Sequence, residues 1–165
     1  MYRKVCIGFI CLVFSGCFQG PTGPQGPSGI SDKQIRLETL LSDGSIDTIW
    51  DYLNPSDYFI KFNKNNYVNV DSIIFVVNAG SADVNTFCLV ELFNAQDLSP
   101  INGGLISSND TSHEPNSITP LGWAQTGNIF NSLPNEESTI GIRVKSSKQG
   151  NLVVIDKACL FLYRH

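Results

Sequence analysis

The residue types that perform acid–base and metal chemistry are sparse in this sequence. It contains two histidines, His113 and His165, so a histidine-based catalytic triad or a multi-histidine zinc site is hard to build. His113 stands beside Glu114 and near Asp110, and these side chains could contact a metal; the alternative is a solvated polar loop. No serine lies in a Gly-x-Ser-x-Gly turn. We therefore expect no catalytic residues and a protein that is not an enzyme.

Carboxylates are more plentiful. Aspartates in expected loops and strand ends could help to hold a structural calcium ion with backbone carbonyls; they are Asp43, Asp47, Asp51, Asp57, Asp83 and Asp110. None has the spacing of an EF-hand, so calcium is an option and no other cofactor is expected. A carboxylate pair could instead support glycoside hydrolysis, but the separation that decides this is set in space. The neighbours Glu136 and Glu137 are more typical of a turn.

Four aromatic residues near expected loops are candidates for a ligand surface: Trp50, Tyr52, Tyr67 and Trp123. Sugar rings stack on aromatic faces, and tryptophan and tyrosine add a polar group. Burial in the core of a small sandwich is the alternative for each of them.

Two cysteines, Cys88 and Cys159, lie in apolar segments typical of strands. In a compartment that permits disulfides they could pair, and a bridge closing so long a loop would add roughly 4 kcal/mol. The alternative, which we favour, is two separate buried thiols that act as small apolar side chains.

The N-terminal residues have the pattern of a secretory signal. Arg3 and Lys4 precede an apolar run over residues 5–14, which is too short to span a bilayer as a permanent helix. Ser15 and Gly16 then precede Cys17. This junction resembles the lipobox of bacterial lipoproteins, which implies that residues 1–16 are removed and that Cys17 is lipidated and becomes the N-terminus. An ordinary cleaved signal is the alternative, and Cys11, after two large apolar residues, is a poorer candidate for the anchor.

Residues 20–31 follow as four Gly-X-Y triplets, the first three with proline after glycine. This is the collagen pattern, in which only glycine fits the axis of a triple helix. The segment could nucleate a homotrimer, or it could act as an extended spacer with a length on the order of 35 Å. We favour the spacer, so residues 17–31 are expected to be a lipidated stalk and residues 32–165 a single folded head domain.

The charge balance excludes some partners. The chain has a formal charge of −4, and removal of residues 1–16 leaves nine basic side chains against 15 acidic ones, a charge of −6. Such a surface disfavours nucleic acid and anionic lipid headgroups. The expected membrane contact is therefore the lipid anchor alone.

Short apolar or alternating segments predict an all-β head. The expected strands cover residues 34–41, 58–62, 68–77, 86–93, 101–106, 123–130, 139–145 and 152–163. The turns expected between them include residues 42–44 and 78–85, and residues 46–53 form either a short helix or an irregular strand. In residues 86–93, Cys88, Val90 and Leu92 share the face without Glu91, which should face the core. This spacing predicts an antiparallel β-sandwich of jelly-roll type.

The complete layout of lipobox, Gly-Pro-X triplets and all-β head resembles the collagen-like lipoproteins of bacteria. The resemblance implies an extracytoplasmic protein anchored at the cell surface or outer membrane. We expect a non-catalytic β-sandwich module that binds a glycan, matrix or protein ligand. The alternatives are a glycoside-type hydrolase with a carboxylate pair and a structural trimerisation head.

Overall fold

The computed structural model describes residues 33–111 and 122–164, and all its elements lie in the unit Asp32–His165. Its strands are β1 (Gln34–Ser45), β2 (Asp51–Tyr52), β3 (Phe59–Phe62), β4 (Val70–Ser81), β5 (Cys88–Asn94), β6 (Pro100–Ser108), β7 (Trp123–Asn128), β8 (Ser138–Ser146) and β9 (Val153–Arg164). Three short 3₁₀ helices are η1 (Pro55–Asp57), η2 (Lys64–Asn66) and η3 (Phe130–Ser132). Within this described part of the chain, no helix has the length and apolar character needed to cross a bilayer.

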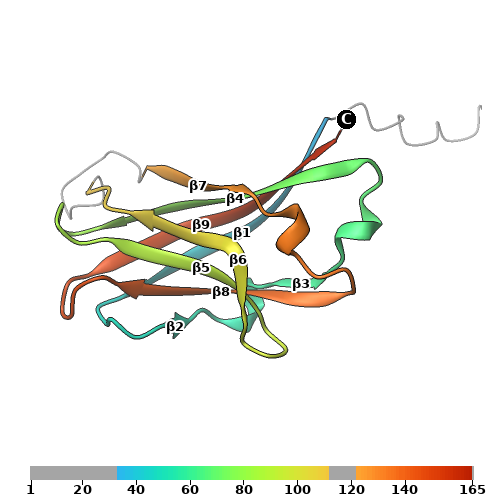
Figure 1. Cartoon of the computed structure of the whole chain (residues 1–165). Coiled ribbons are helices and arrows are strands. Elements are labelled where there is room, and N and C mark those ends of the chain that lie inside the picture. Colours follow the sequence, from blue (N-terminus) through green and yellow to red (C-terminus); the bar gives the residue numbers. More distant parts are fainter. Residues whose placement is uncertain (1–32, 112–121, 165) are drawn as a thin grey trace, which may run out of the picture. The chain divides into compact units, whose positions relative to one another are not determined.

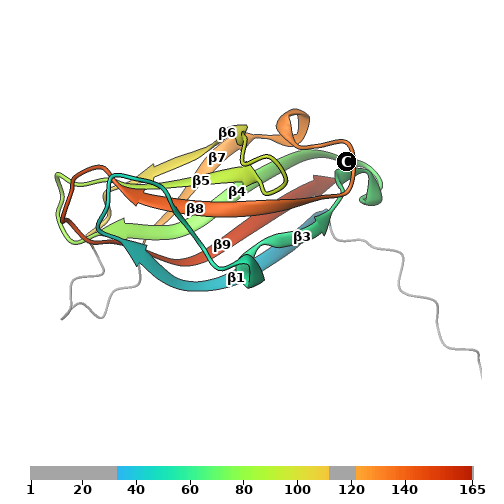
Figure 2. The same ribbon diagram turned by 90° about the horizontal axis from the view of Figure 1, so that it is seen from below.

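The strands form two antiparallel sheets packed face to face (Figures 1 and 2). One sheet has the order β1-β9-β4-β7, and the other has the order β2-β8-β5-β6 with β3 also paired to β8. When β2 and β3 are counted as one interrupted strand, the chain passes between the sheets in jelly-roll order. The antiparallel sandwich predicted from the sequence is therefore confirmed.

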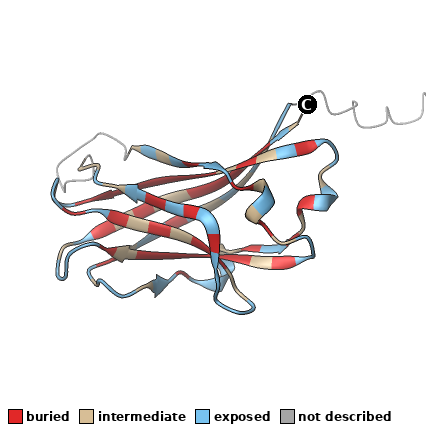
Figure 3. Cartoon of the chain, viewed as in Figure 1, coloured by how far each residue is buried: buried red, intermediate tan, exposed pale blue. Residues whose placement is uncertain are grey.

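The core lies between the two sheets and follows the alternation of the strands. Fully buried side chains come from β4, β5, β8 and β9, and include Ile73, Phe75, Val90, Leu92, Ile142, Val144, Leu160 and Leu162. Figure 3 shows buried and exposed positions alternating along β6. The prediction that Cys88, Val90 and Leu92 face the core is confirmed, because all three are fully buried within the core cluster.

The turn predicted at residues 42–44 was wrong. β1 continues to Ser45, and Asp43, Gly44 and Ser45 pair with β9 after a shift of register between Leu40 and Asp43. The polar residues therefore form a β-bulge within the ladder. Glycine is required at position 44 because a Cβ there would overlap the backbone carbonyl of Val153.

The turn predicted at residues 78–85 also begins too early, since β4 runs on to Ser81. Residues 78–81 are small or polar but remain paired with β9 and are buried. The Ser81 hydroxyl lies 2.7 Å from the carbonyl oxygen of Asp83 and 2.8 Å from that of Thr86. These local acceptors allow a polar side chain to occupy a buried strand position.

Residues 46–53, for which a helix and an irregular strand were both open, form the irregular strand. Only Asp51 and Tyr52 join the ladder with β8, and Leu53 extends it with a bond from its backbone N–H to the carbonyl oxygen of Ile142 at 3.1 Å. Leu53 points into the core and is 2% exposed. The side chains of Trp50 and Tyr52, on either side of Asp51, therefore lie next to β8 on the outer face of the sheet.

Candidate functional site

The outer face of the five-stranded sheet carries aromatic and charged side chains from three strands. The register places Tyr52 of β2 opposite Arg143 of β8, and Arg143 opposite Glu91 of β5. Because the residues before and after Arg143 and Glu91 point into the core, this row points away from it. We call the surface formed by Trp50, Tyr52, Glu91, Phe93, Arg143 and Lys145 the aromatic face.

A nearly buried ion pair lies at the centre of the aromatic face. The Nε of Arg143 donates to Oε2 of Glu91 at 2.8 Å, and Nη2 donates to the same oxygen. The side chains of Arg143 and Glu91 are only 10% and 14% exposed. Burial lowers the pKa of Arg143. The hydrogen bonds and charges of Glu91 and Tyr52 together raise that pKa by more than burial lowers it, so the pKa of Arg143 lies above its ordinary value. The guanidinium therefore stays charged and paired.

Aromatic rings surround this guanidinium. The Cζ of Arg143 lies 4.9 Å from the ring centroid of Trp50, 5.8 Å from that of Tyr52 and 5.5 Å from that of Phe93. Its Nη1 donates to the hydroxyl of Tyr52 at 3.3 Å. The Nζ of Lys145 lies 4.4 Å from the Trp50 centroid. These are cation–π distances, so the charges and rings hold one another in place.

Phe93 lies beneath Tyr52 and Tyr58 and packs against both rings. It is 1% exposed although it lies on the outer side of the sheet, and its ring covers Gly141 of β8, where a Cβ would come within 2.5 Å of its Cε1. Tyr52 and Tyr58 meet this ring edge-on, with centroids 5.1 and 5.6 Å away. Tyr52 is thus fixed on one side by packing while 47% of it stays exposed, which is the arrangement of a preorganised contact residue.

The structure brings together two of the four aromatic residues predicted to contact a ligand. Trp50 and Tyr52 both belong to the aromatic face. Tyr67 instead stacks on Phe62 at 5.9 Å between centroids and packs against the core. Trp123 is 53% exposed but belongs to β7 of the other sheet. Neither of these two can act with Trp50 and Tyr52.

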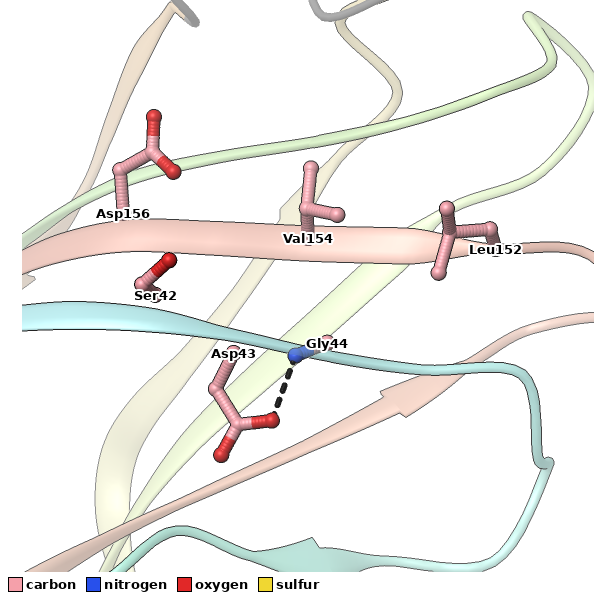
Figure 4. Close-up of a pocket in the computed structure, with 6 residues that line it drawn as sticks. All are labelled: Ser42, Asp43, Gly44, Leu152, Val154 and Asp156. Atoms are coloured by element: carbon pink, nitrogen blue, oxygen red, sulfur yellow. Dashed lines mark hydrogen bonds between the residues drawn. The ribbon is translucent and has the colours of Figure 1, made fainter.

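A shallow hollow of about 320 Å³ lies where the bulge of β1 meets β9. It is lined by Ser42, Asp43, Gly44, Leu152, Val154 and Asp156. Figure 4 shows the carboxylates of Asp43 and Asp156 pointing in opposite directions, and Asp43 accepts a bond from the N–H of Gly44 at 2.7 Å. These two groups do not converge on one point, as the two carboxylates of a glycosidase must.

A second hollow, of about 380 Å³, has a polar lining. It lies between the start of the β5–β6 turn and the segment before β8, and is lined by Asn94, Gln96, Pro134, Asn135, Glu136, Glu137 and Ser138. Glu136 and Glu137 are both exposed there. Glu136 and Glu137 belong to the irregular segment that immediately precedes β8.

The six aspartates considered for calcium each accept a hydrogen bond from a nearby group. Across residues 33–111 and 122–164, no three His, Cys, Asp or Glu side chains form a group suited to a metal ion. Asp110 accepts from the N–H of Gly122, whereas His113 and Glu114, its suggested companions, lie outside the described residues.

The disulfide left open by the sequence is absent, since Cys88 and Cys159 are both free and buried. Cys88 belongs to the core, and its Sγ lies 3.7 Å from the carbonyl oxygen of Val154; burial raises the pKa of this thiol to about 12. Cys159 lies between the core residues Ala158 and Leu160 and therefore points to the other side of β9. The two side chains occupy different faces of the sheet that contains β9, which explains why they do not pair.

The charged part of the aromatic face was not among the residues predicted from the sequence. Arg143 and Glu91 are 52 positions apart, and neither lies in a motif. One signal was available, because Glu91 is the single charged residue among the apolar side chains of residues 87–93. A charge in such a position needs a partner, but only the register identifies that partner as Arg143.

No protein-family model matches this chain, and no curated protein matches it in sequence.

Proposed function

We propose that this protein is a bacterial lipoprotein, anchored by a lipid on Cys17 and displayed outside the cytoplasm, whose β-sandwich is a non-catalytic module that binds a carbohydrate on the aromatic face. The observation that carries the proposal is the exposed ring of Tyr52, held beside Trp50 over an ion pair on an open sheet face. Aromatic rings supply the stacking surface for a sugar, and polar groups between them bond its hydroxyls.

Polar groups of the aromatic face remain available to a ligand. Both bonds from Arg143 go to Oε2 of Glu91, so Oε1 can accept a bond from a sugar hydroxyl. The Tyr52 oxygen accepts from Arg143, which leaves its own O–H to donate. An exposed sheet face with these groups suits a chain-like saccharide that lies along the surface better than a small molecule that needs an enclosed pocket.

Replacing Tyr52 by alanine should weaken carbohydrate binding at least tenfold, a loss of about 1.4 kcal/mol, because the stacking surface and one hydroxyl are removed together. The measurement is titration calorimetry of purified full-length protein in detergent against a panel of soluble polysaccharides. Trp123→Ala is the matched control, since it removes an aromatic residue of similar exposure from the other sheet. Equal affinities for Tyr52→Ala and the unmodified protein, or no binding to any polysaccharide, would contradict the proposal.

Replacing Cys17 by serine should release the protein from the membrane and abolish incorporation of a labelled fatty acid, because serine offers no thiol for the lipid. The measurement is metabolic labelling followed by membrane fractionation. Cys11→Ser is the control and should keep both the label and the membrane location, since Cys11 lies within the segment expected to be removed. Label retained in Cys17→Ser would refute the anchor.

A further inference from the structure

The charges of the aromatic face do not cancel. Arg143 and Glu91 neutralise each other, but Lys145, two positions further along β8, belongs to none of the ion pairs formed within residues 33–111 and 122–164. Its ammonium group lies 4.4 Å from the centroid of the Trp50 ring. Asp51, between Trp50 and Tyr52, accepts a bond from the hydroxyl of Ser45 and lies opposite the core residue Val144. The six side chains of the aromatic face therefore sum to one positive charge, which Lys145 carries.

This positive charge lies at a distance suited to a saccharide. Residues two apart on one face of a strand are separated by about 7 Å, so Lys145 lies one step along β8 from the row that contains Tyr52. That spacing is on the order of one sugar residue. A ring stacked on Tyr52 could therefore place an acidic substituent, its own or that of the next sugar, near the ammonium group. The chain as a whole is acidic, with a net formal charge of −4, so an anion would be attracted to this face in particular.

We infer that the aromatic face selects an acidic saccharide, in which sugar rings stack on Tyr52 and a carboxylate or sulfate group pairs with Lys145. This inference rests on the proposed function and adds the class of ligand. A neutral saccharide would leave the Lys145 charge unused and would be bound more weakly.

The test compares ligands that differ only in charge. Purified full-length protein in detergent is titrated with polygalacturonate and with its methyl ester, and in a second arm with dextran sulfate and dextran. We expect binding of the charged member of at least one pair to be at least tenfold tighter, and added salt should reduce this difference. The first pair reports a carboxylate and the second a sulfate.

Lys145→Gln should abolish the preference for the charged ligand, because it keeps a flexible polar side chain and removes its charge, and Lys145→Arg should retain the preference. Lys157→Gln is the control, since Lys157 is a partly exposed lysine of β9 in the other sheet, near Glu38 at 3.7 Å. Thermal unfolding of each variant shows whether the fold is intact. Tyr52→Ala should weaken binding of the charged ligand as well, which separates stacking from attraction by charge alone.

The outcomes distinguish this inference from the proposed function. Equal affinity for both members of each pair, with binding that still depends on Tyr52, would overturn the acidic saccharide and leave the carbohydrate module in place. Charged polymers that bind equally well to the unmodified protein and to Tyr52→Ala would also overturn the acidic saccharide, because such binding would reflect unspecific electrostatic attraction. If the protein binds none of the four polymers and no other polysaccharide, the proposed function itself is contradicted.

Discussion

Replacing Glu91 by alanine should lower the free energy of unfolding by about 3 kcal/mol, because it leaves the Arg143 guanidinium nearly buried without a counter-charge. The pair is a strong case for this effect, since both side chains are at most 14% exposed and Arg143 makes two bonds to one carboxylate oxygen. Urea denaturation of full-length protein in detergent, followed by tryptophan fluorescence, measures the change.

The matched control is Glu136→Ala, which removes an exposed carboxylate and should change stability by less than about 0.5 kcal/mol. A double variant, Glu91→Leu with Arg143→Met, should recover much of the lost stability, because apolar side chains can replace a buried ion pair at little cost. A Glu91→Ala protein as stable as the Glu136→Ala control would show that the guanidinium is adequately solvated without its partner.

Replacing Gly141 by alanine should destabilise the domain by about 2 kcal/mol and weaken the proposed carbohydrate binding at the same time. The added Cβ would come within 2.5 Å of the Phe93 ring, and that ring cannot move freely because Tyr52 and Tyr58 pack edge-on against it. The displaced ring would disturb the position of Tyr52. Differential scanning calorimetry and the polysaccharide titration measure the two effects.

Gly127→Ala is the control for this substitution. Gly127 lies in β7, and a Cβ there would meet no atom within 4 Å, so the change should be neutral or slightly stabilising. Combining Gly141→Ala with Phe93→Leu should relieve the overlap and recover part of the stability, although not the ligand site. If Gly141→Ala were as stable as Gly127→Ala, the position of the Phe93 ring would not depend on its contact with the backbone of Gly141.

The strands could be predicted because their signal is local. Apolar residues that alternate or run together identify β4, β5, β8 and β9, and the alternation around Val90 gave the correct buried face. The strand ends at Gly44 and Ser81 could not be predicted in the same way. Their residues are typical of turns, yet β9 pairs with both segments from more than 70 positions away, and that pairing overrides the local preference.

The candidate site could be predicted only in part for the same reason. Residue type identified Trp50 and Tyr52, but it identified Tyr67 and Trp123 equally well, and only the topology places these on the core side or in the other sheet. The Arg143–Glu91 pair depends on the register of β5 against β8. Sequence patterns describe what one strand presents on each face, whereas a site on a sheet is formed across strands.

The bulge in β1 has a consequence for many copies of this domain at high density. β1 is the outermost strand of its sheet, and the outer edge of this 12-residue strand offers backbone N–H and C=O groups to which the same strand of a neighbouring molecule could add. The β-bulge between Leu40 and Asp43 interrupts the regular edge of β1. Arg36 and Glu38 form an ion pair at 2.9 Å in the first half of the same strand. Bulges and charged side chains are features that prevent edge-to-edge aggregation. We therefore expect copies of the domain at high density to collide side by side and separate again as individual molecules.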